Sequence, residues 1–566
     1  MREKGQEPSG AGITTIPELI SHVVYRHGDT ALIESSSQSL TYREVDTMSA
    51  GVARGLLAEG AGKGTRVGLL MPNSPEWVVS WLGALRVGAL VSGVSTFLKP
   101  PELEWALRYG DIDTLLMVEG FLRQDFAASL EQSFPELRSR SGARPLRMAS
   151  APYLRSIWVN GNRRPCWSRG SVAELTDRGD ALNDADEQFL RSVEAEVSPA
   201  DQAIVIFTSG SSSHPKAVVH TQGSMVRHAD AIKSYCTCEP GERVGVISPF
   251  FWVGGMLTGL LNTMLSGGTV VLADAPDPTS VLEMIRTRDI DYLISAAGAV
   301  RAIASHPEFR PEDFQRLRPS RARQARLAFF GPQPDHSLDL VPDSLGMTET
   351  FGPHSAELPG TVLPESLAGS FGRPVGLAGG GIERRIVSPE TGEEVPAGEQ
   401  GELLVRGYCM MQGYYKKERE ETFDREGFLH TGDLASIDAA GHLFFAGRRD
   451  EVIKTSDANV SSLEVEAALE ELSEVKEAAV VGRPDEIAGE IVVAFVVMAS
   501  EGAIDEGAMR EALRERLSSY KVPRRICRIP AEEVPRTDAG KIAKSQLAER
   551  MGELLEPVSG EAAPRS

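Results

Sequence analysis

The sequence predicts an α/β protein with a large N-terminal part built on a parallel sheet, followed by a small α+β domain. Over residues 16–126, apolar strand patterns alternate with helix patterns, and such strand–helix–strand units imply parallel strands with helices on the sheet faces. A chain of 566 residues is too long for one core, so it divides into two or more domains. Residues 463–517 add two helices and two strands, which fit a second domain of roughly a hundred residues.

Individual elements can be placed near the N-terminus. Residues 40–45, L-T-Y-R-E-V, open a helix in which Thr41 is the N-cap and Glu44 completes a capping box. Residues 65–71 and 89–94 are strands separated by a helix, and a further strand is expected over 244–251. Residues 138–169 contain eight arginines and scattered prolines without a clean period, so we predict a surface insertion there.

Composition and charge narrow the function classes. The chain is 41% hydrophobic and 25% charged, as in an ordinary globular protein, and its formal net charge of −21 argues against a nucleic-acid or anionic-membrane partner. Five cysteines, among them Cys236 and Cys238, show no C-x-x-C or zinc spacing, so we expect reduced thiols and a cytoplasmic location. Residues 77–94 are apolar but contain Arg86 and three glycines, which favours a helix and a strand over a membrane span.

The most informative stretch is 204–220, I-V-I-F-T-S-G-S-S-S-H-P-K-A-V-V-H. Its apolar, β-branched start predicts a buried strand, which breaks at once into small residues, a proline and a lysine. Glycine and serine let backbone N–H groups converge on an anion, and a lysine adds positive charge. A Ser/Gly-rich turn alone is more often a flexible loop, and the Walker spacing is absent. We predict a phosphate loop formed by Thr208, Ser209, Gly210, Ser211, Ser212 and Lys216.

This loop resembles the signature loop of the adenylate-forming superfamily, which includes acyl-CoA synthetases, luciferases and the adenylation domains of peptide synthetases. Further stretches resemble that family's motifs in the family's order over about residues 16–550: L-G-M-T-E-T at 345–350, G-E-L-L-V-R-G at 401–407, G-Y-Y at 413–415, T-G-D at 431–433, G-R-R-D-E-V-I-K at 447–454 and P-R-T-D-A-G-K-I at 535–542.

The resemblance implies a domain plan. It places an N-terminal adenylate-forming domain with a β-rich subdomain at 14–448, a hinge at 449–450 that pivots about Asp450, and a mobile C-terminal domain at 451–550. Hinges are a few residues that absorb large changes in backbone dihedral angles. The composition of residues 551–566 predicts a disordered tail.

The resemblance also implies roles at the nucleotide. Gly346 would allow close backbone approach, the Thr348 hydroxyl would bond a phosphate, and the Glu349 carboxylate would hold Mg²⁺, a cation that prefers oxygen ligands. Asp433 would accept hydrogen bonds from the ribose hydroxyls. Arg448 would contact ribose or phosphate.

Catalysis is expected to depend most on Lys541. A single lysine on a turn is usually an ordinary surface group, but the motif at 535–542 that contains Lys541 favours a catalytic role. Lys541 would bridge the substrate carboxylate and the α-phosphate of ATP. Together with Thr208 and Glu349 it forms the predicted catalytic set.

Two further regions are assigned by the resemblance. The predicted acyl pocket is lined by Phe251, Trp252, Gly254, Gly331 and Leu345, although plain core packing explains either aromatic residue equally well. The predicted CoA loop contains Lys454, Ser456 and Asp457.

The sequence departs from the family pattern at three places. Asp457 stands where fatty-acid-type synthetases keep a glycine, Leu345 replaces a tyrosine, and the connection before Ser344 is shortened.

The expected function is that of an ATP-dependent carboxylic acid–CoA ligase that uses ATP, Mg²⁺ and CoA on an apolar, fatty or aromatic acid. It would form an acyl adenylate and then the thioester. The alternatives are an enzyme that loads a separate carrier protein, a luciferase-like oxygenase that shares every motif, and an inactive binding homologue. Retention of Lys216, Glu349, Asp433, Arg448 and Lys541 argues against the last.

Overall fold

The computed structural model divides into two compact units, one of Met1–Thr208 with Lys216–Arg449 and a smaller one that continues from Asp450. The structure describes residues 12–180, 185–208, 215–236, 238–295, 297–310, 312–313, 317, 344–358, 361, 363–367, 369–376, 381–448, 452–455, 458–485, 487–499, 505–535, 542, 544 and 546–548.

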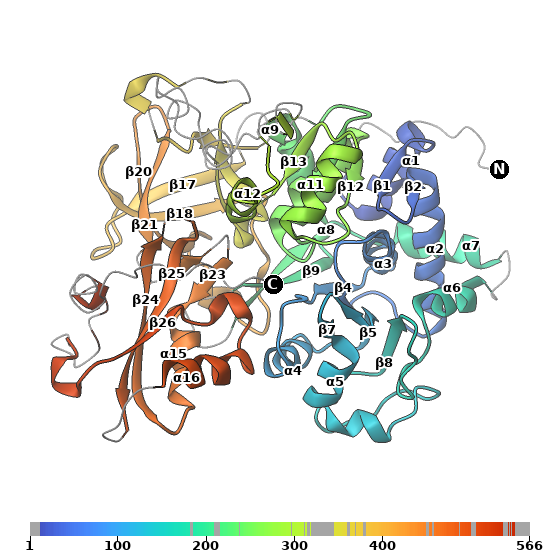
Figure 1. The fold of residues 1–566 in the computed structure, drawn as a ribbon. Helices are drawn as coiled ribbons and strands as arrows, with labels where there is room; N and C mark the ends of the chain where they lie inside the picture. Colours follow the sequence, from blue (N-terminus) through green and yellow to red (C-terminus); the bar gives the residue numbers. More distant parts are fainter. Residues whose placement is uncertain are drawn as a thin grey trace. The chain divides into compact units, whose positions relative to one another are not determined.

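A seven-stranded sheet forms the centre of the larger unit, in the order β19-β10-β9-β4-β3-β5-β8 (Figure 1). The five strands from β9 to β8 are mutually parallel, which confirms the predicted α/β class. β10 is antiparallel to β9, and β19 is antiparallel to β10. The strands are β3 (Arg66–Leu70), β4 (Leu90–Gly93), β5 (Thr114–Val118), β8 (Ser156–Asn160), β9 (Gln202–Thr208), β10 (Lys216–Thr221) and β19 (Gly413–Tyr414).

Both faces of this sheet are covered by helices, as parallel strands require. Successive residues of β5 point to opposite faces, so Leu116 joins one apolar cluster while Leu115 and Met117 join another. The first cluster includes residues of α2 (Tyr42–Ala58) and α3 (Pro75–Arg86), and the second includes residues of α4 (Pro100–Tyr109) and α5 (Phe126–Ser133). The capping box predicted at Thr41 and Glu44 is present at the start of α2.

The predicted surface insertion at 138–169 is wrong in one part, because it contains strand β8. Ile157 and Trp158 of this strand are fully buried, and β8 pairs in parallel with β5. A strand of five residues between arginines leaves little periodic signal. The arginines nearby form ion pairs, such as that between Arg169 and Glu59 at 3.0 Å.

A second sheet has the order β13-β11-β12-β1-β2 and is parallel except for the β1–β2 hairpin. Its strands are β1 (Ala31–Glu34), β2 (Ser39–Thr41), β11 (Arg243–Val246), β12 (Thr269–Val271) and β13 (Tyr292–Ile294). The strand expected over 244–251 is shorter than predicted, since β11 ends before Pro249, which has no N–H to donate to a ladder.

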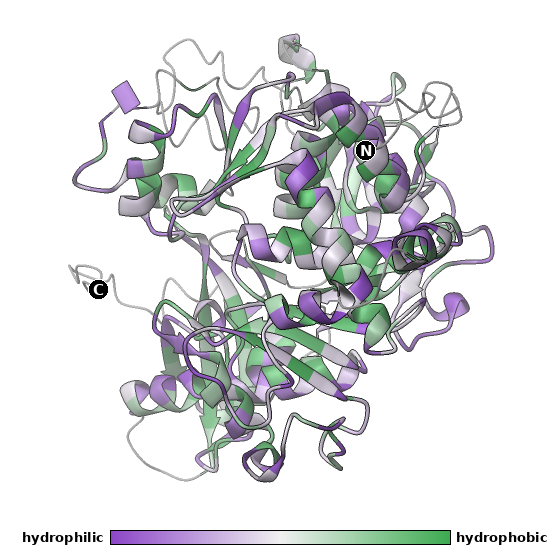
Figure 2. Ribbon diagram, turned by 90° about the vertical axis from the view of Figure 1, so that its right-hand side faces the viewer, coloured by the Kyte–Doolittle hydropathy of each residue, from purple (hydrophilic) through white to green (hydrophobic). Residues whose placement is uncertain are grey.

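The remaining helices of the larger unit vary in length. They are α1 (Ile16–His27), α6 (Val172–Asp180), α7 (Ala185–Ala195), α8 (Gln222–Ala231), α9 (Lys233–Cys236), α10 (Asn262–Ser266), α11 (Pro278–Thr287) and α12 (Ala297–Ala304), with a π-helix, η2, at Gly254–Leu261. In Figure 2, the helical ribbons carry both hydrophobic and hydrophilic residues, as amphipathic packing requires. No helix among the described residues combines the length and apolar character that a membrane crossing needs.

Antiparallel strands complete the larger unit. A four-stranded sheet, β17-β18-β20-β21, follows a three-stranded sheet, β14-β15-β16. Their bounds are β14 (Leu345–Met347), β15 (Gly352–Ala356), β16 (Arg373–Pro374), β17 (Ile382–Val387), β18 (Gly401–Gly407), β20 (Leu429–Ile437) and β21 (Leu443–Arg448).

The smaller unit is an α+β domain with its own core. Its sheet has the order β23-β22-β25-β24, and β26 pairs with β25. Lys521 and Glu464 form an ion pair of 2.7 Å whose side chains are almost fully buried. The elements are β22 (Val452–Thr455), β23 (Ala458–Ser461), α15 (Ser462–Glu470), β24 (Val475–Asp485), β25 (Gly489–Met498), α16 (Glu506–Arg514) and β26 (Arg525–Arg528).

Three fully buried histidines occupy neighbouring elements of the larger unit, with His220 on β10, His228 on α8 and His354 on β15. Burial lowers the pKa of His220 to about 4 and the pKa values of His228 and His354 to about 3. All three imidazoles are therefore neutral at neutral pH. Their ordinary pKa of 6.5 returns when the chain unfolds.

This difference predicts that acid destabilises the larger unit before carboxylates titrate. The unfolded state binds more protons than the folded state below pH 6.5, so the free energy of unfolding falls as the pH falls towards 4, by about 1.4 kcal/mol per pH unit for each histidine. Denaturant titrations between pH 7 and 5 should show this slope. In the His228→Gln variant, the free energy of unfolding should fall by about 1.4 kcal/mol less per pH unit, because one histidine fewer takes up a proton on unfolding. An unchanged pH dependence in that variant would contradict the low pKa of His228.

Candidate functional site

The two ends of the predicted phosphate loop are adjacent in the seven-stranded sheet. Thr208 ends β9 and Lys216 begins β10, and the two residues are Cα partners in the antiparallel ladder. Buried strands hold both ends, since Ile204 and Val205 on one side and Val218 and Val219 on the other are almost inaccessible. The sheet therefore places the first hydroxyl and the lysine of the predicted loop side by side.

Lys216 and Glu349 are brought together by Tyr414. The Tyr414 hydroxyl donates a hydrogen bond of 2.8 Å to Glu349 Oε1, and the Lys216 ammonium lies 5.0 Å from the centre of the Tyr414 ring. All three side chains are half-buried. Sequence reasoning placed Tyr414 only in a strand motif and missed this contact.

A short turn carries the predicted Thr348 and Glu349 between β14 and β15. The Thr348 carbonyl accepts hydrogen bonds from the Phe351 N–H at 3.0 Å and from His220 Nε2 at 2.7 Å. Phe351 is fully buried against the His220 ring and has a φ of 53°, which is unusual for a residue with a side chain. Such a conformation persists where its surroundings determine it, so the turn that presents Glu349 is held firmly.

Gly346 is needed by the hairpin itself. A Cβ atom there would lie 2.3 Å from the Gly352 carbonyl oxygen on the facing strand. This close contact between β14 and β15 accounts for the glycine, while its predicted approach to the nucleotide stays a prediction.

Asp433 and Arg448 face each other in the β20–β21 hairpin, as Cα partners. Asp433 is buried, and its N–H donates to Thr431 Oγ1 at 3.0 Å. Leu429, at the start of β20, packs in the same apolar cluster as Met347 and Tyr414. The hairpin with the predicted ribose ligand is thus attached to the segments that surround Glu349.

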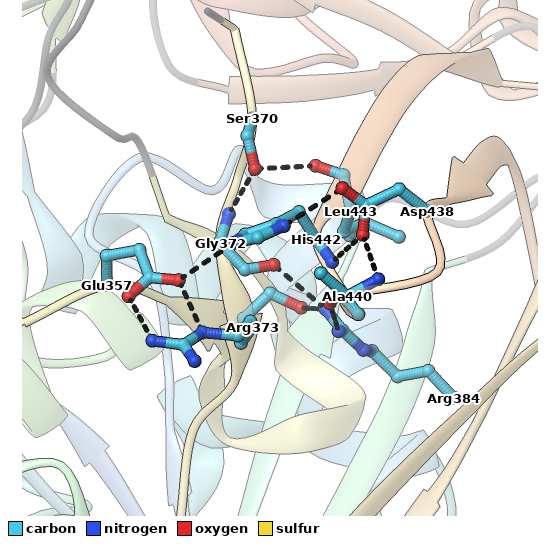
Figure 3. Close-up of polar contacts among 11 residues, drawn as sticks. Glu357, Ser370, Gly372, Arg373, Arg384, Asp438, Ala440, His442 and Leu443 are labelled. Carbon is cyan, nitrogen blue, oxygen red and sulfur yellow. Dashed lines mark hydrogen bonds and ion pairs between the residues drawn. The ribbon is translucent and has the colours of Figure 1, made fainter. Parts of the chain in front are cut away.

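The opposite end of this hairpin is fixed by a cluster of charged groups (Figure 3). His442 Nδ1 lies 2.9 Å from Asp438 Oδ2, and His442 Nε2 lies 4.0 Å from Glu357 Oε1. Glu357 accepts two hydrogen bonds from Arg373, at 3.0 and 3.2 Å. Arg384 donates to the carbonyl oxygen of Gly441 in the hairpin turn at 2.6 Å. These contacts tie the turn to β16 and β17.

Two aromatic residues predicted to line the acyl pocket lie in a wall of three contacting rings. The rings of Phe251 and Trp252 lie 5.6 Å apart at 77°, and Phe97 contacts both at 5.9 and 6.0 Å. Phe251 is buried and Trp252 is half-buried. Phe97 was missed by sequence reasoning, although it closely follows β4, at the edge where parallel strands present functional side chains.

The π-helix η2 follows this wall, and π-helical turns are frequent at functional sites. Gly254 at its start is exposed, and a Cβ there would meet no atom within 4 Å, whereas a Cβ on Gly255 would lie 2.2 Å from the Pro249 carbonyl oxygen. A Cβ on Gly352 would lie 2.4 Å from Leu257 Cδ2 of η2. The helix therefore packs directly against the turn that carries Glu349. Leu345 is half-buried and packs on the main core.

In the smaller unit, Lys454 is exposed on β22 and its N–H donates to Glu490 Oε2 at 2.7 Å. Two residues within three positions after the predicted catalytic lysine are anchored. Ile542 packs against the β24–β25 core, and Lys544 forms an ion pair of 2.7 Å with Glu466 of α15.

Several predicted features lie outside the described part of the chain, and their roles stay predictions. These are the hinge 449–450, the shortened connection before Ser344, the tail 551–566, the side chain of Arg448, and the residues Ser209, Gly210, Ser211, Ser212, Gly331, Asp450, Ser456, Asp457 and Lys541.

The donor atoms present suit a nucleotide-borne Mg²⁺. Among the described residues, no group of three or more His, Cys, Asp or Glu side chains could hold a metal ion by itself. Mg²⁺ is commonly bound through one or two carboxylates together with substrate phosphates and water. Glu349 beside Lys216 supplies one carboxylate next to the predicted phosphate loop, and this donor set fits such a cation.

Comparisons with known proteins agree with this geometry. The family model described as AMP-binding enzyme matches residues 20–415, and the model of the AMP-binding enzyme C-terminal domain matches residues 464–541. A feruloyl-CoA synthase of Amycolatopsis sp is 30% identical over 536 residues, which cover 93% of this chain and 95% of that protein.

Two solved structures are also similar. The amide bond synthetase McbA of Marinactinospora thermotolerans shares the fold with a TM-score of 0.73 at 24% identity, covering 94% of this chain and 99% of that one. The anthranilate CoA ligase AuaEII, solved with anthranoyl-AMP, has a TM-score of 0.62 at 25% identity, covering 94% and 96%. The matches confirm the resemblance to adenylate-forming enzymes. The chain therefore belongs to the AMP-binding enzyme family, as an enzyme of the AMP-forming acyl-CoA synthetase class.

Proposed function

We propose that this protein activates an apolar carboxylic acid, preferably an aryl acid, as its acyl adenylate and then transfers the acyl group to CoA. The observation that carries the proposal is the contact of Tyr414 with both Lys216 and Glu349, beside the paired ends of the predicted phosphate loop. Both the Lys216 ammonium and the Glu349 carboxylate contact this one tyrosine, which supports a role for the first at phosphate and for the second at Mg²⁺.

The first step solves a leaving-group problem. A carboxylate is a poor acylating agent because its leaving group would be oxide, so its oxygen attacks the α-phosphorus of ATP instead. A C–O–P bond forms, the bond between the α- and β-phosphates breaks, and pyrophosphate leaves. Such phosphoryl chemistry is catalysed mainly by positioning and charge neutralisation.

Each group has a part in that step. Lys216 and the hydroxyl of Thr208, with the loop between them, hold the β- and γ-phosphates. Mg²⁺ on Glu349 would supply further positive charge at the phosphates. Asp433 binds the ribose, and Lys541 draws the carboxylate and the α-phosphate together.

The second step uses a different set of residues from the C-terminal domain. The C-terminal domain, 451–550, turns about Asp450 relative to the domain 14–448, which withdraws Lys541 and presents the loop with Lys454, Ser456 and Asp457. The CoA thiol then attacks the acyl carbonyl carbon, the C–O bond to AMP breaks, and the thioester and AMP are the products.

Two findings support an aryl acid over a fatty one. Phe97, Phe251 and Trp252 form an aromatic wall just before η2, which packs against Gly352, and aromatic rings favour edge-to-face contacts with a ring substrate. The relatives named above include a feruloyl-CoA synthase and an anthranilate CoA ligase. A cytoplasmic location agrees with the thiols of Cys166, Cys409 and Cys527, which form no disulfide in the described part of the chain.

The proposal predicts pyrophosphate release that depends on an acid and rises with CoA. A panel of aryl, fatty and polycyclic acids should be assayed with and without CoA, and at least one aryl acid should give the largest CoA-dependent rate. Release that is indifferent to CoA would favour loading of a separate carrier protein. No release with any acid, while ATP still binds, would contradict the proposal.

For Lys541→Ala, we expect adenylate formation to fall by about 100-fold or more, because the two anions are no longer drawn together. Thioester formation from a supplied acyl adenylate should stay near the wild-type rate. Lys476→Ala, which changes an exposed lysine of the same unit, serves as the control. Equal loss of both half-reactions in Lys541→Ala would remove the dedicated adenylation role.

Gly254→Ala should leave the melting temperature unchanged, because the added methyl group meets no atom within 4 Å. If Gly254 borders the acid, kcat/KM for a bulky acid should fall by about 10-fold relative to a small one. Gly255→Ala is the matched comparison and should unfold at a lower temperature, since its Cβ meets a backbone oxygen at 2.2 Å. An unaltered ratio between the acids in Gly254→Ala would exclude Gly254 from the pocket.

A further inference from the structure

Tyr414 touches two of the charged side chains on which the proposed adenylation depends. Its hydroxyl donates to Glu349 Oε1 at 2.8 Å, and its ring faces the Lys216 ammonium at 5.0 Å. A cation at that distance from an aromatic ring is attracted by the ring electrons. The two contacts use different parts of one side chain, so they can be made at the same time.

The backbone fixes Tyr414 relative to both partners. Tyr414 on β19 is the Cα partner of Val218 on β10, two residues after Lys216. Just before β19, the Met411 N–H donates to the Glu349 carbonyl oxygen at 2.8 Å. The segments with Lys216 and Glu349 are thus both hydrogen-bonded to the segment with Tyr414, and the side-chain contacts follow from the sheet.

The hydrogen bond from the Tyr414 hydroxyl also orients the Glu349 carboxylate. A carboxylate has two oxygens, and the bond from Tyr414 to Oε1 sets the plane of the group while Oε2 takes no part in that bond. Partners that hydrogen-bond to a metal-binding carboxylate orient it, and their removal typically reduces metal affinity or activity by about 10- to 100-fold.

We infer that Tyr414 is a positioning residue that orients Glu349 towards Mg²⁺ and keeps Lys216 at the phosphates, so that metal and nucleotide bind as one unit. This inference rests on the proposed function, because it assumes that Glu349 holds the metal. It assigns to Tyr414 a role that its place in a strand motif did not indicate.

The test compares Tyr414→Phe, Glu349→Gln and the double variant with the wild-type enzyme. Tyr414→Phe keeps the ring and removes only the hydroxyl. The matched control is Tyr415→Phe, whose hydroxyl bonds Asp111 Oδ2 at 3.0 Å. Three quantities are measured: the melting temperature, the Mg²⁺ concentration for half-maximal pyrophosphate release, and calorimetric binding of a non-hydrolysable ATP analogue with and without Mg²⁺.

For Tyr414→Phe, we expect the required Mg²⁺ concentration to rise by about 10-fold or more and the Mg²⁺-dependent part of analogue binding to weaken by a similar factor. The KM for the acid and the melting temperature should change little, and Tyr415→Phe should match the wild type. In the Glu349→Gln background, Tyr414→Phe should have no further effect, because the group on which it acts is gone.

Two results overturn the inference in different ways. If Glu349→Gln raises the Mg²⁺ requirement but Tyr414→Phe does not, or if the two effects simply add, Tyr414 does not act through Glu349 and the proposed function stands. If Glu349→Gln itself leaves the Mg²⁺ requirement unchanged, the proposed metal role of Glu349 fails and the inference fails with it.

Discussion

The antiparallel pairing of β10 with both β9 and β19 is the constraint on which the candidate site depends. An otherwise parallel sheet receives one reversed strand, and this reversal brings Lys216 back beside Thr208. The same strand pairs with β19 on its other edge, which places Tyr414 next to Lys216. The charged side chains of the site therefore owe their proximity to main-chain hydrogen bonds, and those bonds are shielded by buried apolar neighbours on both faces.

Polar groups in the interior extend this frame to the more distant parts of the site. His220 Nε2 lies 2.7 Å from the Thr348 carbonyl oxygen, and burial keeps this imidazole neutral at physiological pH, so the contact adds no charge to the interior. At the far end of the β20–β21 hairpin, Arg384 and the His442 cluster fasten the turn (Figure 3). Strand β20, which carries Asp433, is thus held by ion pairs and hydrogen bonds at the turn that follows it and by apolar packing at its start.

The sequence predicted the class of the fold and the buried strand that ends at Thr208, because strand–helix alternation and an apolar run that breaks into small residues are local patterns. It did not predict β8, a short strand among arginines, or the contact between Tyr414 and Glu349, which are 65 residues apart. Phe97 was missed for a related reason, since its partners Phe251 and Trp252 belong to another motif. Contacts between distant segments leave no period in the sequence, so they emerge only once the sheet order is known.

The pairing of Thr208 with Lys216 also bears on how the length of the loop between them is controlled. The ends of the seven residues 209–215 are held together by the ladder whatever the loop contains. The entropy of closing a loop grows slowly with length, and doubling it costs only about 0.6 kcal/mol. Insertions here should therefore be tolerated by the fold. Under the proposed function they would remove the fit to an anion, so the ligand, and not stability, would set the length of this loop.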